Sequence, residues 1–228
     1  MRRASLSRAS VLALVLAVPC VHRASGEMPP AFGSGSSRLD SRDFRVVDGP
    51  SRGSAVYYKV VEGPEGRMLR GQYRPGLQSV VLGAPVPKEL RSRVRRVRWR
   101  WRARAFPAGG DECYGLGDSA ASVFISFKRG LRWYILKYVW SPLSPLGATC
   151  DRKRSLFLHR DTIVLERDGP TDKWLSELVD VRQAFLDHFA NGNPKADVPD
   201  LVGIGVMTDG DQTHSESGAD WADFELEY

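Results

Sequence analysis

Three oxygen-bearing side chains alternate along one run near the carboxyl end of the sequence. Asp209, Asp211 and Thr213 follow an apolar stretch, and their alternation can direct oxygens toward a common point. Oxygens are the ligands of hard cations, so these residues together with Asp118 predict a calcium site. His214 stands where a helix-loop-helix calcium hand needs glycine, which excludes that motif. The alternative is a polar connection whose carboxylates accept backbone N–H groups.

A second set of candidate ligand-binding residues is aromatic. The chain has six Trp and seven Tyr residues, and flat rings suit the apolar faces of sugars. Within residues 133–140, apolar groups occupy both faces of an expected strand. Such a strand is either covered on both sides or lines a binding groove with one face. The second alternative makes the ring-bearing residues Tyr134, Tyr138 and Trp140 the candidates for glycan binding.

Residues 94–105 carry the strongest pattern in the chain. In an extended strand, Val97, Trp99 and Trp101 share one face, while arginines at even-numbered positions form a ladder on the other. The aromatic face is expected to enter a core. The arginine face offers candidates for binding an anionic ligand, namely Arg98, Arg100 and Arg102.

The last eight residues indicate where the arginine ladder lies. In 221–228, apolar side chains alternate with Asp223, Glu225 and Glu227, which gives one apolar and one acidic face. Opposite charges across paired strands stabilise by about 0.2–1 kcal/mol each. We therefore predict that this strand pairs with the arginine strand in one sheet. The arginines are then either a neutralised, solvated face or an anion-binding surface.

Catalytic motifs are absent from the sequence. It contains no nucleophile elbow, no phosphate-binding glycine loop and no His-Glu-x-x-His. A glycosidase needs only two carboxylates at a suitable separation, and Glu177 and Asp209 are the candidates for that pair. We nevertheless expect a protein that is not an enzyme.

The first 26 residues have the layout of a secretory signal peptide. Arginines precede the apolar run 11–18, which is too short to span a bilayer, and small residues follow near Gly26. Residues 27–42 are rich in Pro, Gly and Ser, which predicts a flexible lead-in to a single domain over 43–228. We expect export to the periplasm or beyond, without stable membrane insertion once the signal is cleaved.

Export also changes the charge argument. The chain has 33 basic and 27 acidic residues, and removal of residues 1–26 would leave 29 and 27. A nearly neutral mature chain does not support general nucleic-acid binding, which needs a strong positive field.

Two cysteines remain after the predicted signal. In an oxidising compartment Cys113 and Cys150 most simply form a disulfide, expected to join two loops at one end of a sheet. Free thiols or a metal pair are the alternatives, although no nearby His or Cys completes a zinc site.

Short apolar or alternating runs separated by Gly and Pro predict many strands. The only strong helical stripe lies in Val181–Phe189, and a short helical turn is expected in 86–93. This pattern predicts an all-β fold, an antiparallel, jelly-roll-like β-sandwich with one short helix. The expected strands are 44–47, 55–61, 68–73, 79–82, 94–105, 120–127, 133–140, 155–166, 174–180, 201–208 and 221–228.

Several of these motifs occur in an order that resembles one bacterial family. They are Trp99-Arg-Trp101, Gly117-Asp118, Tyr138-Val-Trp140, Trp174 with Glu177 and Val181, and the run from Gly203 to Thr213. The resemblance is to the domain-of-unknown-function family numbered 3047 and covers roughly residues 44–228. It implies an exported β-sandwich similar to carbohydrate-binding jelly rolls, and it does not point to any known activity.

The sequence thus predicts an exported domain that binds a glycan or another envelope component. The alternatives are a carbohydrate-active hydrolase and an envelope protein whose partner is another protein. Calcium is the one cofactor that the residues suggest.

Overall fold

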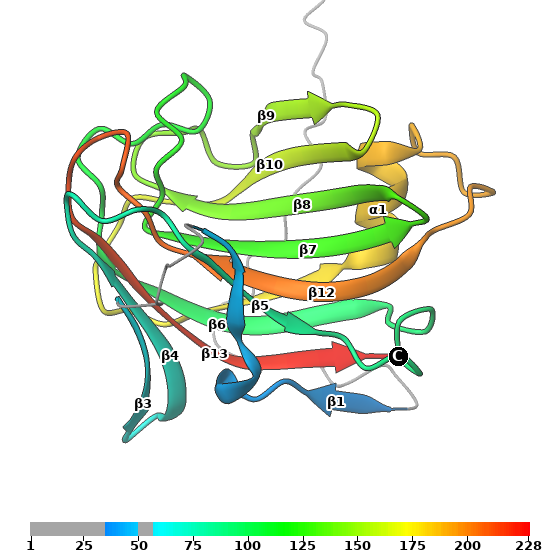
Figure 1. Ribbon diagram of the computed structural model, residues 1–228, viewed down its shortest axis with the longest axis horizontal. Coiled ribbons are helices and arrows are strands. Elements are labelled where there is room, and N and C mark those ends of the chain that lie inside the picture. Colours follow the sequence, from blue (N-terminus) through cyan, green and yellow to red (C-terminus); the bar gives the residue numbers. More distant parts are fainter. Residues whose placement is uncertain (1–34, 50–56) are drawn as a thin grey trace, which may run out of the picture. The chain divides into compact units, whose positions relative to one another are not determined.

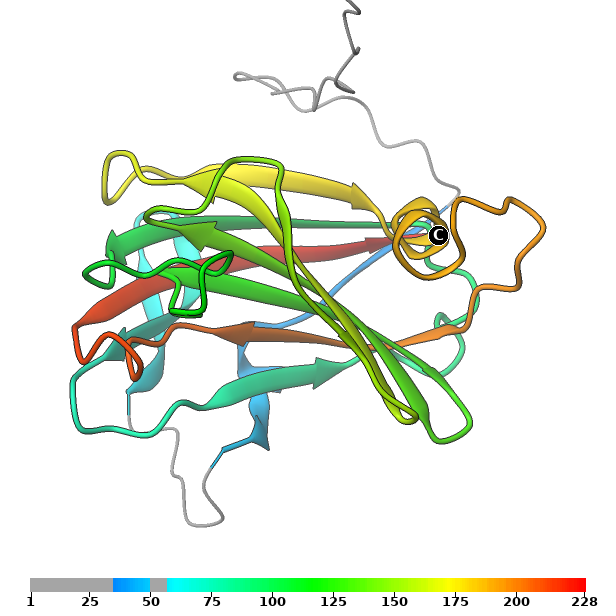
Figure 2. The ribbon, with the colours of Figure 1, turned by 90° about the horizontal axis from the view of Figure 1, so that it is seen from above.

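The computed structural model describes residues 35–49 and 57–228, which form two β-sheets stacked face to face (Figures 1 and 2). Sheet A has the order β11-β6-β13-β4-β3, with β1 also paired to β13. Its strands are β1 (Ser36–Arg38), β3 (Tyr58–Gly63), β4 (Gly66–Tyr73), β6 (Arg96–Ala105), β11 (Leu175–Asp180) and β13 (Ser217–Glu227).

Sheet B has seven strands in the order β2-β5-β12-β7-β8-β10-β9. The strands are β2 (Arg45–Asp48), β5 (Val81–Pro85), β7 (Ala121–Arg129), β8 (Arg132–Ser141), β9 (Thr149–Arg154), β10 (Leu158–Arg167) and β12 (Asp200–Met207). Two sheets enclosing a common core confirm the predicted β-sandwich.

The predicted pairing of the arginine strand with the last strand is confirmed. β6 and β13 run antiparallel, with Trp101 opposite Trp221 and Val97 opposite Leu226. Their apolar faces enter the core, where Trp99, Trp101 and Trp221 are fully buried. This burial is the main favourable contribution of the pair to folding.

One strand pair departs from the antiparallel prediction. β10 lies parallel to β8, with Leu158 opposite Trp133 and Val164 opposite Val139. The connection after β8 passes the position next to it, so β9 forms the edge and β10 returns between the two (Figure 1). β9 runs opposite to β8, and β10 pairs antiparallel with β9, so β10 runs parallel to β8.

The predicted helix is confirmed as α1 (Val181–Phe189), which lies at one end of the sandwich (Figures 1 and 2). Asp180 caps its first turn by accepting hydrogen bonds from the backbone N–H groups of Arg182 and Gln183. Val181 and Phe185 are its buried residues. The turn expected in 86–93 forms hydrogen-bonded turns rather than a helix.

The predicted flexible lead-in is wrong in its last part. Ser36–Arg38 forms β1 on β13, and Asp40 caps the 3-10 turn η1 (Ser41–Asp43). This polar segment forms a strand because its backbone pairs with β13. Its own sequence has no apolar alternation from which a strand could be predicted. The predicted signal peptide, and residues 27–34, lie outside the described residues. Within residues 35–49 and 57–228, no helix has the length and apolar character needed to cross a membrane.

Candidate functional site

The arginine ladder of β6 is paired with carboxylates of the protein itself. Three of these ion pairs join Arg98 to Glu227 at 3.0 Å, Arg100 to Asp223 at 2.6 Å and Arg102 to Asp220 at 2.7 Å. The geometry corrects the assignment of these arginines to an anionic ligand, because each of them is already paired with a carboxylate of β13.

Asp220 is the centre of this ladder, and the sequence analysis missed it. It is fully buried and binds Arg70 and Arg102 at 2.7 Å each. Arg102 also lies over the ring of Trp174, at 4.7 Å from its centroid. A register shift between Ala222 and Glu225 brings Asp220 onto the same face as Glu225 and Glu227. The alternation of 221–228, continued backwards without that shift, would place Asp220 on the apolar face, which is why the sequence did not identify it.

The aromatic residues predicted to bind a glycan lie in the core. Trp140 packs against Trp101 with ring centroids 5.8 Å apart, and Tyr138 packs against Trp99 at 6.0 Å. Tyr134 packs against Phe185 of α1. Tyr134, Tyr138 and Trp140 are therefore buried between the layers, and their assignment to a binding groove is wrong.

The predicted acidic residues do come together at one end of sheet B. β7 pairs with β12 so that Ser122 lies opposite Met207. The loop that leads into β7 and the loop that leaves β12 are therefore neighbours. Asp118 lies in the first loop, and Asp209 and Asp211 lie in the second. One carboxylate oxygen from each residue lies within 4.8 Å of the others.

Two of these carboxylates are buried with unsatisfied oxygens. Asp209 is 5% exposed and Asp118 is fully buried. In the described part of the chain, neither Asp118 Oδ1 nor Asp209 Oδ1 has a hydrogen-bond partner. An unpaired buried carboxylate oxygen is costly. A bound cation would compensate both oxygens.

Burial raises the pKa of Asp209 to about 8, with the nearby carboxylates of Asp118 and Glu112 adding to the effect and Lys137 opposing it. A bound divalent cation would reverse this by stabilising the ionised form. Three clustered carboxylates offer the hard oxygen ligands that Ca²⁺ prefers. Because Asp211 is exposed, water or a bound molecule could supply further oxygens on its side.

Thr213 has a different role from the predicted one. Its backbone N–H donates to Asp118 Oδ2 at 2.7 Å, and its hydroxyl is hydrogen-bonded to Ser215 at 2.7 Å. Thr213 therefore orients Asp118. The alternative of a polar connection between strands predicts such a backbone bond to a carboxylate. The bond to Asp118 Oδ2, however, leaves Asp118 Oδ1 and Asp209 Oδ1 without partners in the described residues.

A buried ion pair between Lys137 and Glu112 lies near the acidic cluster. Lys137 on the outer face of β8 binds Glu112 at 2.7 Å, and Ser119 donates to the same Glu112 oxygen at 2.8 Å. All three side chains are buried. The sequence signal was Lys137 itself, a single charge inside an otherwise apolar strand.

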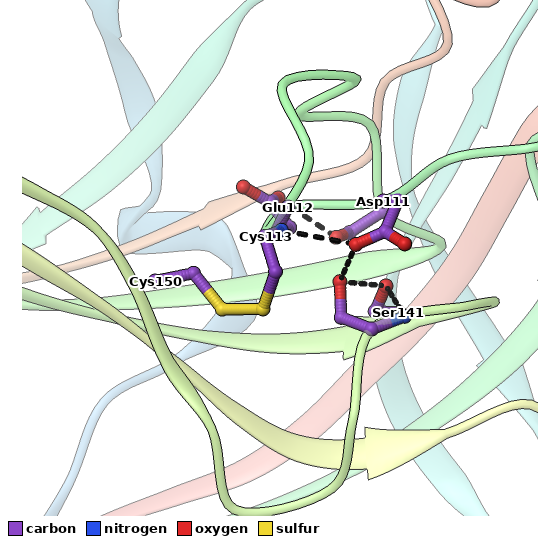
Figure 3. The surroundings of a disulfide bond; sticks show 7 residues. Asp111, Glu112, Cys113, Ser141 and Cys150 are labelled. Carbon is purple, nitrogen blue, oxygen red and sulfur yellow. Dashed lines mark hydrogen bonds between the residues drawn. A yellow bond between two sulfur atoms is a disulfide. The ribbon is translucent and has the colours of Figure 1, made fainter.

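The predicted disulfide between Cys113 and Cys150 is confirmed and fixes the same loop (Figure 3). Cys150 lies in β9 rather than in a loop, so the bridge joins the 106–120 loop to the edge strand of sheet B. Beside it, Asp111 accepts hydrogen bonds from Ser144 Oγ at 2.7 Å and from the backbone N–H of Cys113 (Figure 3). The loop is therefore held by covalent and polar contacts, and Tyr114 extends from it, 81% exposed.

The two carboxylates proposed for a hydrolase are not brought together as a pair. Glu177 lies on β11 of sheet A, where it accepts a hydrogen bond from Trp101 Nε1 at 3.0 Å. Burial raises the pKa of Glu177 to about 8, and the charge of Glu166 adds to the effect. Asp209 follows β12 of sheet B and has different charged neighbours.

Comparison with known proteins gives one family. The profile of a family described as a protein of unknown function, DUF3047, matches residues 58–225. The chain belongs to the DUF3047 family. This confirms the resemblance inferred from the motif order. No curated protein matches the chain.

Solved structures similar to this DUF3047 protein include a family 11 carbohydrate-binding module from Clostridium thermocellum in complex with a β-1,3-1,4-mixed-linked tetrasaccharide. The TM-score is 0.43 and the identity 11%, over 84% of this chain and 95% of that one. The Trichoderma harzianum endoglucanase 3 from family GH12 gives a TM-score of 0.40 and 10% identity, over 84% and 95%.

Removal of the disulfide should destabilise the fold without abolishing it. The bridge spans 37 residues, so the double variant C113S/C150S should lose about 3–4 kcal/mol of unfolding free energy. Urea unfolding followed by Trp fluorescence measures this loss. A loss below about 1 kcal/mol would show that the polar contacts of the loop suffice without the bridge.

The raised pKa of Glu177 predicts a loss of stability with rising pH. The folded protein keeps this proton up to about pH 8, whereas the unfolded chain releases it near the ordinary Glu pKa of about 4.3. The contribution of Glu177 is therefore full below pH 4.3 and falls as the pH rises to 8. Thermal unfolding at pH 5 and pH 8.5 should show a smaller decrease in Tm for E177Q than for the wild type. The exposed Glu89 provides the control E89Q, and equal decreases in all three proteins would contradict the assignment.

Proposed function

We propose that this DUF3047 protein is a non-enzymatic domain that binds a hydroxyl-rich ligand, a glycan or glycan-bearing envelope component, at a calcium ion held by Asp118, Asp209 and Asp211. The observation that carries the proposal is that Asp118 and Asp209, whose carboxylates cluster with that of exposed Asp211, each have a buried oxygen without a hydrogen-bond partner in the described part of the chain. Uncompensated carboxylates of this kind are stabilised by a divalent cation.

The glycan is expected to bind on the side of Asp211, because this is the exposed carboxylate of the three. Asp118 and Asp209 close the inner side of the cation, while Asp211 opens to solvent. Ca²⁺ takes six to eight oxygens, so three carboxylates leave positions that sugar hydroxyls can fill. The exposed ring of Tyr114 lies on the loop that leads to Asp118, where it can stack on an apolar sugar face.

Export is part of the proposal. The Cys113–Cys150 disulfide favours an oxidising compartment, and the first 26 residues have the layout of a secretory signal. Calcium is present at about millimolar concentration outside the cytoplasm, so a site built from loops that binds calcium weakly would be occupied there.

One observation favours a second function, that of a carbohydrate-active hydrolase. Glu177 has a pKa of about 8 and lies close enough to Glu166 for their charges to interact, as required of an acid paired with a second carboxylate. Its Oε1, however, is bound to the fully buried Trp101. We therefore prefer the binding function, and hydrolysis of a bound glycan would decide for the alternative.

Calcium should stabilise the wild-type protein through this cluster. At a calcium concentration one hundred times Kd the gain is about 2.7 kcal/mol, or about 5–10 °C in Tm. D118N and D209N should lose this shift, because each removes a buried ligand charge. D200N, at an exposed site on β12 outside the cluster, should retain it. An equal calcium shift in D209N and the wild type would place the ion elsewhere, and no shift in the wild type would contradict the site.

Glycan binding should depend on both the cation and the exposed ring. On a panel of neutral and acidic polysaccharides, the wild type should bind in calcium and lose binding in chelator. Y114A should bind at least tenfold more weakly while keeping the calcium shift in Tm, and Y114F should bind like the wild type. Binding that survives both the chelator and Y114A would contradict a calcium-centred glycan site.

A further inference from the structure

Two hairpin tips lie side by side at the end of sheet B that is opposite the acidic cluster. One tip, residues 130–131, joins β7 to β8, and the other, residues 155–157, joins β9 to β10 (Figure 2). They are hydrogen-bonded to each other, since the backbone N–H of Trp133 donates to the Phe157 carbonyl at 2.8 Å. Arg132 Nε also donates to the Leu156 carbonyl at 3.0 Å. The tips therefore form one surface of fixed geometry.

Large apolar side chains extend from this surface into solvent. Leu131 is 77% exposed, Leu156 68% and Phe157 56%, and Trp133 beside them is also exposed. Single exposed apolar residues are ordinary, but a group on two bonded tips is not. These four residues, the apolar tip group, contribute little to the core and are free to contact a partner.

Basic residues surround the apolar tip group. Residues 128–133 and 151–160 contain seven Lys or Arg residues and one acidic residue, Asp151. Asp151 pairs with Arg160, and Asp197 from the loop before β12 pairs with Arg129 at 3.0 Å. Lys153 Nζ also lies 3.9 Å from Asp151. The other cations are Lys128, which lies over the Trp133 ring, and Arg132, Arg152 and Arg154.

Cations outnumber carboxylates on this surface, where Asp151 and Asp197 are exposed and a third acidic partner, Asp161, is buried. Arg154 contacts buried Asp161 at 2.5 Å, and His188 of α1 holds the other oxygen of that carboxylate at 2.9 Å. Arg152 and Lys153 are exposed on β9, next to the tip. The seven cations of residues 128–133 and 151–160 therefore outnumber the exposed carboxylates of Asp151 and Asp197, and the net charge around the apolar tip group is positive.

We propose that the two tips dock on the surface of an anionic lipid bilayer. Leucine and aromatic side chains enter the boundary between headgroups and acyl chains, and flanking lysines and arginines contact the anionic headgroups. A nucleic acid or acidic polysaccharide would use the same cations but would gain little from Leu131, Leu156 and Phe157. The exposure of these side chains is what favours a bilayer.

This inference does not depend on the calcium site. β7 and β8 separate the tips from the acidic cluster, which lies where β7 begins. A molecule docked through its tips would hold the opposite loops, with Tyr114 and Asp211, away from the membrane. The two surfaces can therefore be tested by separate variants.

Vesicle sedimentation tests the docking surface directly. The purified protein should sediment with vesicles of 30% phosphatidylglycerol in phosphatidylcholine and much less with phosphatidylcholine alone. L156S/F157S and R152E/K153E should each reduce the partition coefficient by about tenfold or more, because one removes the inserted groups and the other the attraction to headgroups. L146S, an equally exposed leucine at the opposite end, and K88E should sediment like the wild type.

The same variants distinguish the competing explanations. Equal sedimentation of L156S/F157S and the wild type would overturn insertion of the tips. If R152E/K153E lost binding to heparin and vesicles alike while L156S/F157S lost neither, the surface would be a general polyanion site. Unchanged Tm values for all four variants, expected because the altered residues are exposed, would show that lost binding is not lost folding.

Discussion

The pairing of β6 with β13 is the interaction on which the rest of the structure depends. Its apolar face places Trp99, Trp101 and Trp221 in the core, and its polar face carries charges that must be balanced as the strands come together. Asp220 is fully buried between arginines of β4 and β6, and a buried carboxylate is tolerated only with such partners. One strand pair thus contributes both the core and the ion pairs of sheet A.

Both sheets contribute to the core, and sheet B also carries buried polar groups on its outer face and at one end. The Trp residues of β6 are covered by Tyr138 and Trp140 of β8, which fixes the register between layers. The outer face of β8 then carries Lys137, whose pairing with Glu112 attaches the 106–120 loop. That loop positions Asp118, and the pairing of β7 with β12 places it beside Asp209 and Asp211.

Much of the fold could be predicted because, in a strand that alternates apolar and charged residues, the apolar face must be the one that enters the core. Residues 94–105 and 221–228 met that condition, and their pairing was predicted correctly. Strand 133–140 did not meet this condition. Its two faces are both apolar, so the sequence does not show which face enters the core and which is covered by a loop. The strand β9, whose sequence is mostly charged, was missed because its partner β10 holds it and its own pattern does not.

The acidic cluster was predictable in composition but not in its electrostatics. Alternating oxygens identified Asp209 and Asp211, and strand pairing then brought Asp118 to them. Burial, which leaves two oxygens without partners and raises the pKa of Asp209 to about 8, depends on packing that no local pattern specifies.

A crystal structure of the protein grown in millimolar calcium would show whether the acidic cluster of Asp118, Asp209 and Asp211 holds a calcium ion. The account predicts a calcium ion with oxygens of Asp118, Asp209 and Asp211 at about 2.3–2.6 Å, and water completing its shell on the side of Asp211. Anomalous scattering would identify the ion. A cluster without an ion, in which water or backbone N–H groups satisfy Asp118 and Asp209, would contradict the account.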